Sequence, residues 1–192
     1  MIRAIFPLPV FILPQGYTRL RIFETRYLEM VKESLKNDSC FVLCLYDQDA
    51  QLNVPEYGCL VEIIDFDKDE NDHLLIDVVA KSLVKISNVS QNKINLRHGK
   101  VETVESPQWL YQSQPMTTQN DYLKTSLELV FNQDHEIAAL YKHTEFDNLA
   151  WVTARWLELL PISYEKKQQL AFSSSFANIQ TFLHTVINNE LT

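Results

Sequence analysis

The spacing of apolar residues changes along this chain of 192 residues. Before Pro107, apolar residues alternate with polar ones or form short continuous runs, which is typical of strands. After Pro107 they recur three and four residues apart, which is typical of amphipathic helices. Strands first and helices afterwards predict an α+β fold, because the two kinds of element then occupy separate parts of the structure.

The part before Pro107 predicts several strands and one helix. The run Cys40 to Tyr46 is continuously apolar, as expected of a buried strand. Further strands are expected at residues 58–66, 73–80, 82–87 and 101–104. The polar residues 67–72 predict a hairpin turn. A helix is expected over residues 24–35, with its buried face formed by Tyr27, Leu28, Val31 and Leu35.

The composition changes between Glu105 and Thr118, where two prolines and three glutamines occur. We therefore expect a β subdomain over residues 1–105, a linker over 106–118 and a helical subdomain over 119–192. In the helical part, Ser163 is expected to cap a short helix that ends at Ala171. Ser174 or Ser175 is expected to open the final helix.

The charge balance disfavours nucleic acid as the main partner. The chain has 17 Lys and Arg against 25 Asp and Glu, a net charge of −8, whereas nucleic acid requires a basic surface. Arg19, Arg21 and Arg26 form the only basic concentration. We expect Arg19 and Arg21 on the outer face of one strand, with acidic partners nearby; an anion or partner site is the alternative.

The cysteines, the apolar runs and the glycines restrict the compartment and the chemistry. The three cysteines, Cys40, Cys44 and Cys59, do not suit a disulfide framework and predict buried thiols in the cytoplasm. No apolar run reaches the roughly 18 residues of a membrane span, so no membrane association is expected. The three glycines cannot provide a P-loop or a nucleophile elbow.

No catalytic residue, metal ligand or cofactor is predicted. The segment Asp65 to Asp69 has the spacing of a calcium loop, but Glu70 stands where that loop requires glycine. His135 and Glu136 begin a zinc motif whose second histidine is replaced by Ala139. The three tryptophans are expected to pack in the core and the linker rather than to form a stacking platform.

Three segments together resemble the Lon-protease substrate-binding domain family. The opening has the family's P-L-P stretch, then apolar residues, Pro, Gly and an I-F-E-x-R-Y segment, here Pro7, Leu8, Pro9, Pro14, Gly16, Ile22, Phe23, Glu24, Arg26 and Tyr27. The segment Tyr57 to Ile63, which includes Gly58, is similar to the family's G-x-x-A-E-I strand. Leu159 to Gln168 is similar to its late helical segment.

The resemblance implies a PUA-like β pseudobarrel with one helix, followed by a C-terminal helical bundle. It also implies a non-catalytic module that binds polypeptides and lacks the ATPase and protease domains of Lon. The implied partners are unfolded or partly folded polypeptides, or a protein partner such as a separate ATPase or protease. A structural role is expected for the signature residues Pro7, Pro14, Gly16, Phe23, Glu24, Arg26, Tyr27 and Gly58.

A polypeptide-binding module needs exposed apolar side chains. Candidates are the large side chains before the Pro-Gly turn and those of the facing connection: Phe11, Ile12, Leu13, Tyr17 and Tyr57. The alternative is that these residues close the end of the barrel. Two other functions remain open: an RNA-binding PUA-like domain, and a peptidase or hydrolase that acts alone.

Overall fold

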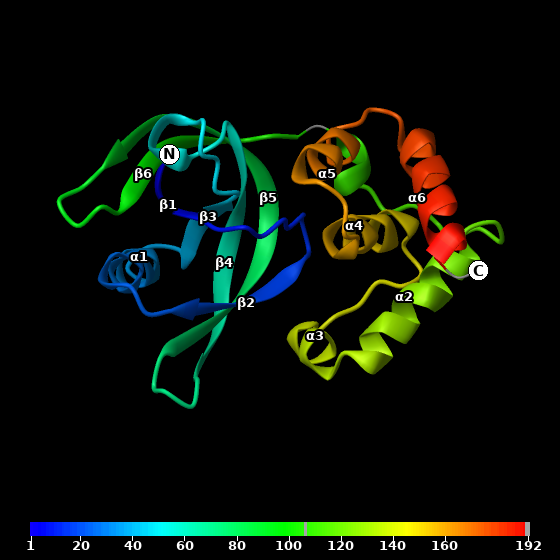
Figure 1. Cartoon of the computed structure of the whole chain (residues 1–192), viewed down its shortest axis with the longest axis horizontal. Coiled ribbons are helices and arrows are strands. Elements are labelled where there is room, and N and C mark those ends of the chain that lie inside the picture. Colours follow the sequence, from blue (N-terminus) through cyan, green and yellow to red (C-terminus); the bar gives the residue numbers. More distant parts are fainter. Residues whose placement is uncertain (106, 191–192) are drawn as a thin grey trace. The chain divides into compact units, whose positions relative to one another are not determined.

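The structure is a computed structural model that describes residues 1–105 and 107–190. The chain divides into two compact units, Met1–Val104 and Glu105–Thr192. Strands make up most of the first unit and helices most of the second, which confirms the predicted α+β composition (Figure 1).

Six strands form one sheet in the first unit. In chain order they are β1 (Ile2–Pro7), β2 (Tyr17–Ile22), β3 (Cys40–Cys44), β4 (Tyr57–Lys68), β5 (Leu74–Gln91) and β6 (Arg97–Thr103). Their order in the sheet is β2-β5-β4-β3-β1-β6, and β5 also pairs with β6. Five strands therefore form a closed ring of pairings, and β2 extends the sheet beyond that ring. Only β1 and β3 pair in parallel.

Strand β5 is longer than the sequence predicts. The segments 73–80 and 82–87, expected as two strands, belong to one strand of 18 residues. The register against β4 shifts between Leu60 and Val61, which pair with Ser82 and Ala80. Lys81 is thus the extra residue of a β-bulge, which bends a strand and re-aims its side chains. The change in apolar pattern there marks the bulge rather than a strand end.

The ring of strands encloses a small apolar core. Its buried members come from β1, β3, β5, β6 and the connection before β4: Ile5, Val42, Cys44, Val54, Val84, Ile86 and Val101. Gly58 allows β4 to approach β3 closely. A Cβ added at Gly58 would lie 2.9 Å from the Leu43 carbonyl oxygen and 2.9 Å from Val42 Cγ1, so a larger residue requires the strands to move.

Helix α1 (Thr25–Leu35) packs beside β1 and β3. The Tyr27 ring lies 3.8 Å from the Phe6 ring, centroid to centroid, and Tyr27, Met30, Val31 and Ser34 are buried. Of the predicted stripe, Tyr27 and Val31 are buried and Leu28 is half-buried, whereas Leu35 is 48% exposed. The helix turns its Tyr27–Met30 side to the sheet, and Leu35 at its last residue then points away.

The connection from β1 to β2 enters β2 through a tight turn. Gly16 donates its backbone N–H to the Leu13 carbonyl at 2.9 Å, with Pro14 and Gln15 between them. Gln15 has φ 66°, as the third position of a type II turn requires. The positive φ thus falls on Gln15, one residue before the glycine of the expected Pro-Gly turn. Ile12 and Leu13 are buried before this turn.

The second unit contains five α-helices among its described residues. They are α2 (Asp121–Gln133), α3 (His135–Leu140), α4 (Leu149–Leu159), α5 (Tyr164–Ala171) and α6 (Phe176–Glu190). Ser163 accepts a hydrogen bond from the Lys166 N–H and so caps α5 as predicted. Ser175 accepts one from the Asn178 N–H at the start of α6. Helix α4 is buried on all sides from Leu149 to Leu157, so it forms the centre of this unit.

Much of the expected linker folds with the helical unit. A 3-10 turn, η2 (Gln108–Leu110), buries Trp109, whose ring lies 5.3 Å from that of Phe176. Farther on, the Leu149 N–H donates to the Gln114 carbonyl at 2.7 Å. These contacts explain why the compact unit begins at Glu105.

Candidate functional site

The residues expected to bind polypeptide differ in accessibility. Ile12 and Leu13 lie in the core of the first unit, so their side chains are not available to a ligand. This burial corrects the expectation for these two residues, because the turn after them directs their side chains inward. Phe11, Tyr17 and Tyr57 are half-buried and keep part of their surface exposed.

The sheet register separates Tyr57 from Tyr17. Tyr17 pairs with Val79 of β5, and Val79 pairs with Glu62 of β4. Tyr57 lies five residues before Glu62 on β4, a distance of about 16 Å along a strand. Tyr17, the first residue of β2, and Tyr57 therefore do not form one contact point, and Phe11 lies in the connection before β2.

Two other phenylalanines in the first unit are more exposed than this set. Phe23, directly after β2, is 62% exposed, and Phe66, on β4, is 46% exposed. Phe23 meets the His73 ring edge-on at 6.1 Å between centroids. As a member of the family signature, Phe23 is expected to have a structural role. The alternation along β2 is a signal for this exposure, because Phe23 directly follows Ile22, which is buried.

The arginines of β2 are paired with carboxylates. Arg19 donates from Nε to Asp77 Oδ1 at 2.6 Å and from Nη2 to Asp77 Oδ2 at 2.9 Å. Its Nη1 lies 3.5 Å from Asp67 Oδ2. Arg21 Nε lies 2.6 Å from Asp69 Oδ2, and its Nη2 lies 2.7 Å from His73 Nδ1. The expected solvated face with acidic partners is confirmed, and these guanidinium groups do not form an open anion site.

The signature residues at the start of α1 contact one another. Arg26 Nη2 lies 2.7 Å from Glu24 Oε2, and the Arg26 guanidinium carbon lies 4.7 Å from the centre of the Tyr27 ring. Glu24 occupies the N-cap position of α1. Its carbonyl accepts hydrogen bonds from the Tyr27 and Leu28 N–H groups. Burial raises the pKa of Tyr27.

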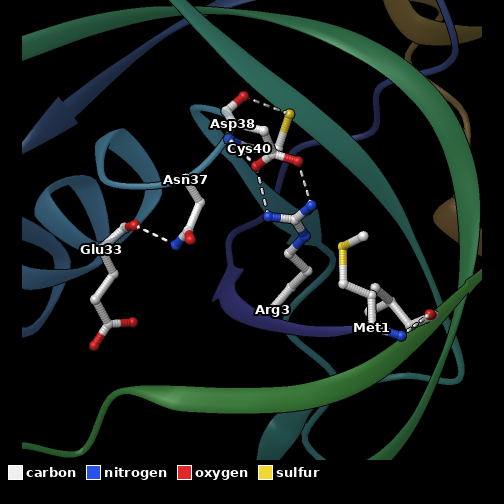
Figure 2. A network of polar contacts seen from close by, with 7 residues as sticks. Met1, Arg3, Glu33, Asn37, Asp38 and Cys40 are labelled. Carbon is white, nitrogen blue, oxygen red and sulfur yellow. Dashed lines mark hydrogen bonds and ion pairs between the residues drawn. The ribbon is translucent and has the colours of Figure 1, made fainter.

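A second polar network joins the start of β1 to the turn between α1 and β3 (Figure 2). Arg3 on β1 donates from both terminal nitrogens to the two carboxylate oxygens of Asp38. Asp38 Oδ1 also accepts the Cys40 N–H at 3.3 Å. The hydrogen bond from Arg3 lowers the pKa of Asp38. The pair is not evident from the sequence, because 35 residues separate its members.

Two of the three thiols, those of Cys40 and Cys44, are held in their protonated form. Cys40, Cys44 and Cys59 are free cysteines. Burial raises the pKa of the Cys44 thiol to about 12 and also raises the pKa of Cys40, where Asp38 and Glu62 add to the effect. A nucleophilic cysteine needs the opposite shift. Within the described residues, no group of three or more His, Cys, Asp or Glu side chains could hold a metal ion.

A tyrosine, a histidine and an asparagine form a hydrogen-bonded chain in the helical unit. Tyr122 Oη lies 2.6 Å from His184 Nδ1, and His184 Nε2 lies 3.0 Å from Asn120 Oδ1. The Asn120 amide nitrogen donates to Thr117 Oγ1 at 2.9 Å. Burial raises the pKa of Tyr122 to about 12, so its hydroxyl stays protonated and donates to His184. These hydrogen bonds connect α6 to α2.

The family model of the ATP-dependent protease La (LON) substrate-binding domain matches residues 3–176. The chain belongs to this family. The match extends over both compact units, from β1 to the start of α6. It confirms the resemblance that the opening segment and the two later segments indicated.

Solved structures of Lon N-terminal domains have the same fold. The Lon N-terminal domain protein from Xanthomonas campestris matches with a TM-score of 0.70 at 24% identity, over 97% of this chain and 98% of that one. The N-terminal domain of Mycobacterium avium complex Lon protease matches with a TM-score of 0.60 at 9% identity, over 96% of this chain and 97% of that one. Among curated proteins, none matches this sequence. Within the described part of the chain, no helix is long and apolar enough to cross a membrane.

Proposed function

We propose that this LON-domain chain recognises segments of unfolded or partly folded polypeptide and performs no catalysis itself. The observation that carries the proposal is the match to a substrate-binding domain over residues 3–176. Phe11, Tyr17 and Phe23 support it, because aromatic surface on the first unit can gain hydrophobic contact with an unfolded chain.

Two thiols and one hydroxyl that could serve as nucleophiles are protonated near neutral pH. The Cys40 and Cys44 thiols and the Tyr122 hydroxyl have raised pKa values and stay protonated near neutral pH. The hydrogen bonds that connect Tyr122, His184 and Asn120 resemble a catalytic proton relay. The group at its start, the Tyr122 hydroxyl, is however a poor nucleophile. These states favour a binding module over a peptidase or hydrolase that acts alone.

An RNA-binding role is less well supported. Arg19 and Arg21, the basic pair of β2, already face Asp77, Asp67 and Asp69, and the chain carries a net charge of −8. Binding phosphates there would require these ion pairs to break. The polypeptide proposal needs no such change.

The proposal also covers the architecture of each unit, the cellular compartment and a protein partner. We infer that the closed ring of β5, β4, β3, β1 and β6, with α1 beside it, is a PUA-like pseudobarrel, and that the helices of the second unit form a bundle. Free cysteines favour the reducing cytoplasm as the compartment. A separate ATPase or protease is a candidate protein partner, which co-purification from the native cells would identify.

The test is binding of short fluorescein-labelled, unstructured peptides, measured by fluorescence anisotropy. If Phe11 and Tyr17 contact the peptide, Phe11→Ser with Tyr17→Ser should weaken binding by about 1–3 kcal/mol. Leu159→Ser, at an exposed position of the helical unit, is the control. Circular dichroism should show that the double variant remains folded.

Absence of binding to every peptide would contradict the proposed function. Unchanged affinity in a folded double variant would instead place the contact away from Phe11 and Tyr17. The non-catalytic part is tested separately: neither ATP hydrolysis nor cleavage of unfolded casein is expected. Turnover that survives repurification would overturn it.

A further inference from the structure

Three arginines are buried among the described residues: Arg3, Arg97 and Arg155. Arg3 is paired with Asp38, and Arg155 is paired with Glu158. Arg97, the first residue of β6, is only 9% exposed, yet it forms no ion pair with any carboxylate in the described part of the chain. An unpaired charge in the interior is strongly disfavoured. The guanidinium of Arg97 therefore lacks a counter-charge that the other two buried arginines have.

The guanidinium of Arg97 is bonded firmly through one nitrogen only. Its Nε donates to the Leu52 carbonyl at 2.6 Å. Its Nη2 lies 3.5 Å from Asn53 Oδ1, which is at the limit of a hydrogen bond. No nitrogen of Arg97 is both sealed from solvent and without a partner, so the N–H groups that these contacts leave over reach solvent. The two terminal nitrogens are the pair that binds a carboxylate in bidentate fashion, and this end of the side chain is available to a ligand.

Two neutral side chains beside Arg97 are further hydrogen-bond donors. The Asn53 amide nitrogen donates to no other group of the described residues. Burial raises the pKa of Tyr27, and the charges of Arg26 and Arg97, together with a hydrogen bond from Arg97, oppose that rise. The Tyr27 hydroxyl therefore lies beside Arg97 and keeps its proton, which it can donate. A guanidinium, an amide and a phenol together form a set of donors suited to an anion.

The carboxylates of the neighbouring segments do not neutralise Arg97. Glu24, at the start of α1, is paired with Arg26 at 2.7 Å. Asp47 and Asp49 lie in the connection between β3 and β4, where Asp47 Oδ1 accepts the Asp49 N–H at 3.0 Å. Neither of them is within ion-pair distance of Arg97. The group that complements Arg97 is therefore an anion from another molecule.

We propose that Arg97, Asn53 and Tyr27 bind a carboxylate of the polypeptide that this protein recognises. The terminal nitrogens of Arg97 donate to the two carboxylate oxygens, and the Asn53 amide and the Tyr27 hydroxyl donate to the same group. The C-terminus of a polypeptide and the side chains of aspartate and glutamate present this same planar group. The inference rests on the proposed function and names the chemical group that is bound.

The experiment compares three unlabelled, N-acetylated peptides by isothermal titration calorimetry. All are unstructured and consist of leucine, serine and glycine. The first has a free C-terminal carboxylate, the second has a C-terminal amide, and the third has the amide with one serine replaced by aspartate. At least one carboxylate peptide should bind about tenfold more tightly than the uncharged one, because hydrogen bonds to charged groups are the stronger ones. Which of the two does so identifies the source of the carboxylate.

Protein variants locate the site. Asn53→Asp places a carboxylate of the chain itself 3.5 Å or less from Arg97 Nη2, and aspartate tolerates the positive φ of 60° at this position as asparagine does. The variant should melt at a higher temperature than the wild type and lose the preference for a carboxylate peptide. Asn88→Asp is the matched control, because Asn88 is exposed and has a similar φ of 51°. Arg97→Met should also lose the preference; if it does not fold, Asn53→Asp decides.

The outcomes separate this inference from the function beneath it. If none of the three peptides binds and unfolded polypeptides fail as well, the proposed function is wrong and this inference fails with it. If all three bind with equal affinity, the function stands and carboxylate recognition is excluded. A folded Asn53→Asp variant that keeps the full preference for a carboxylate peptide would likewise overturn the site at Arg97.

Discussion

Arg3 and Asp38 form a bidentate ion pair that connects β1 to the turn after α1 (Figure 2). The Arg3 side chain is almost fully buried, whereas half of the Asp38 side chain is exposed. A buried guanidinium needs its partner, because an unpaired charge in the interior is strongly disfavoured. The pair therefore fixes the position of β1 relative to α1 and β3.

The Arg3–Asp38 pair should make stability depend on pH at the acid end. The pKa of Asp38 in the folded protein lies below its ordinary value, which is about 4 in an unfolded chain. The stabilisation is fully present above that ordinary value and is lost as pH falls through the folded pKa. Urea denaturation of the wild type and of Asp38→Asn should give stabilities that differ most near neutral pH and converge once the pH falls below the folded-state pKa of Asp38. A constant difference across this range would contradict the assignment.

Arg26→Ala should lower the melting temperature. The substitution removes the ion pair with Glu24 and the contact with the Tyr27 ring, which together are worth about 1 kcal/mol. Lys32→Ala, on the exposed side of the same helix, is the matched control. Differential scanning calorimetry measures both. Equal melting temperatures for Arg26→Ala and wild type would show that this signature residue is not structural.

Gly58→Ala should destabilise the ring of strands by about 1–3 kcal/mol. The added methyl group would meet the Leu43 carbonyl oxygen at 2.9 Å, and backbone cannot yield as a flexible side chain can. Asp65→Ala places alanine at an exposed position of the same strand and should change the free energy of unfolding by far less. Chemical denaturation measures the free energy of unfolding of both variants. Equal losses of this free energy would show that the close approach of β4 to β3 does not require glycine at position 58.

Tyr122→Phe should weaken the helical unit by about 1 kcal/mol, because it removes the hydroxyl that donates to His184 Nδ1. The ring contact with His184 remains in this variant. Titration of tyrosine absorbance should show that one group ionising near pH 12 in the wild type is missing in Tyr122→Phe. Peptide binding should be unchanged, since Tyr122 lies in the helical unit; a loss of binding without unfolding would give this residue a functional role.

The order of elements could be predicted because it depends on local patterns. Alternating and helical spacing of apolar residues distinguishes strands from helices, and Ser163 has the side chain that caps a helix. The family could be predicted because its signature is a set of residues at fixed spacing, and the match over residues 3–176 confirms it. The outward direction of Arg19 and Arg21 followed from the same local alternation, whereas the carboxylates Asp67 and Asp77 that pair with Arg19 lie 48 and 58 residues farther along the chain.

Tertiary structure alone decided which apolar residues are accessible. Ile12, Leu13 and Phe23 are all large apolar residues of the opening segment, yet the first two are buried and the third is mostly exposed. The difference arises from the turn at Gln15 and from the pairing of β2 with β5, which fix the direction of each side chain. The bulge at Lys81 and the Arg3–Asp38 pair likewise depend on partners far apart in the chain. A sequence pattern records neighbours along the backbone, whereas burial is set by contacts that form only when distant segments pack together.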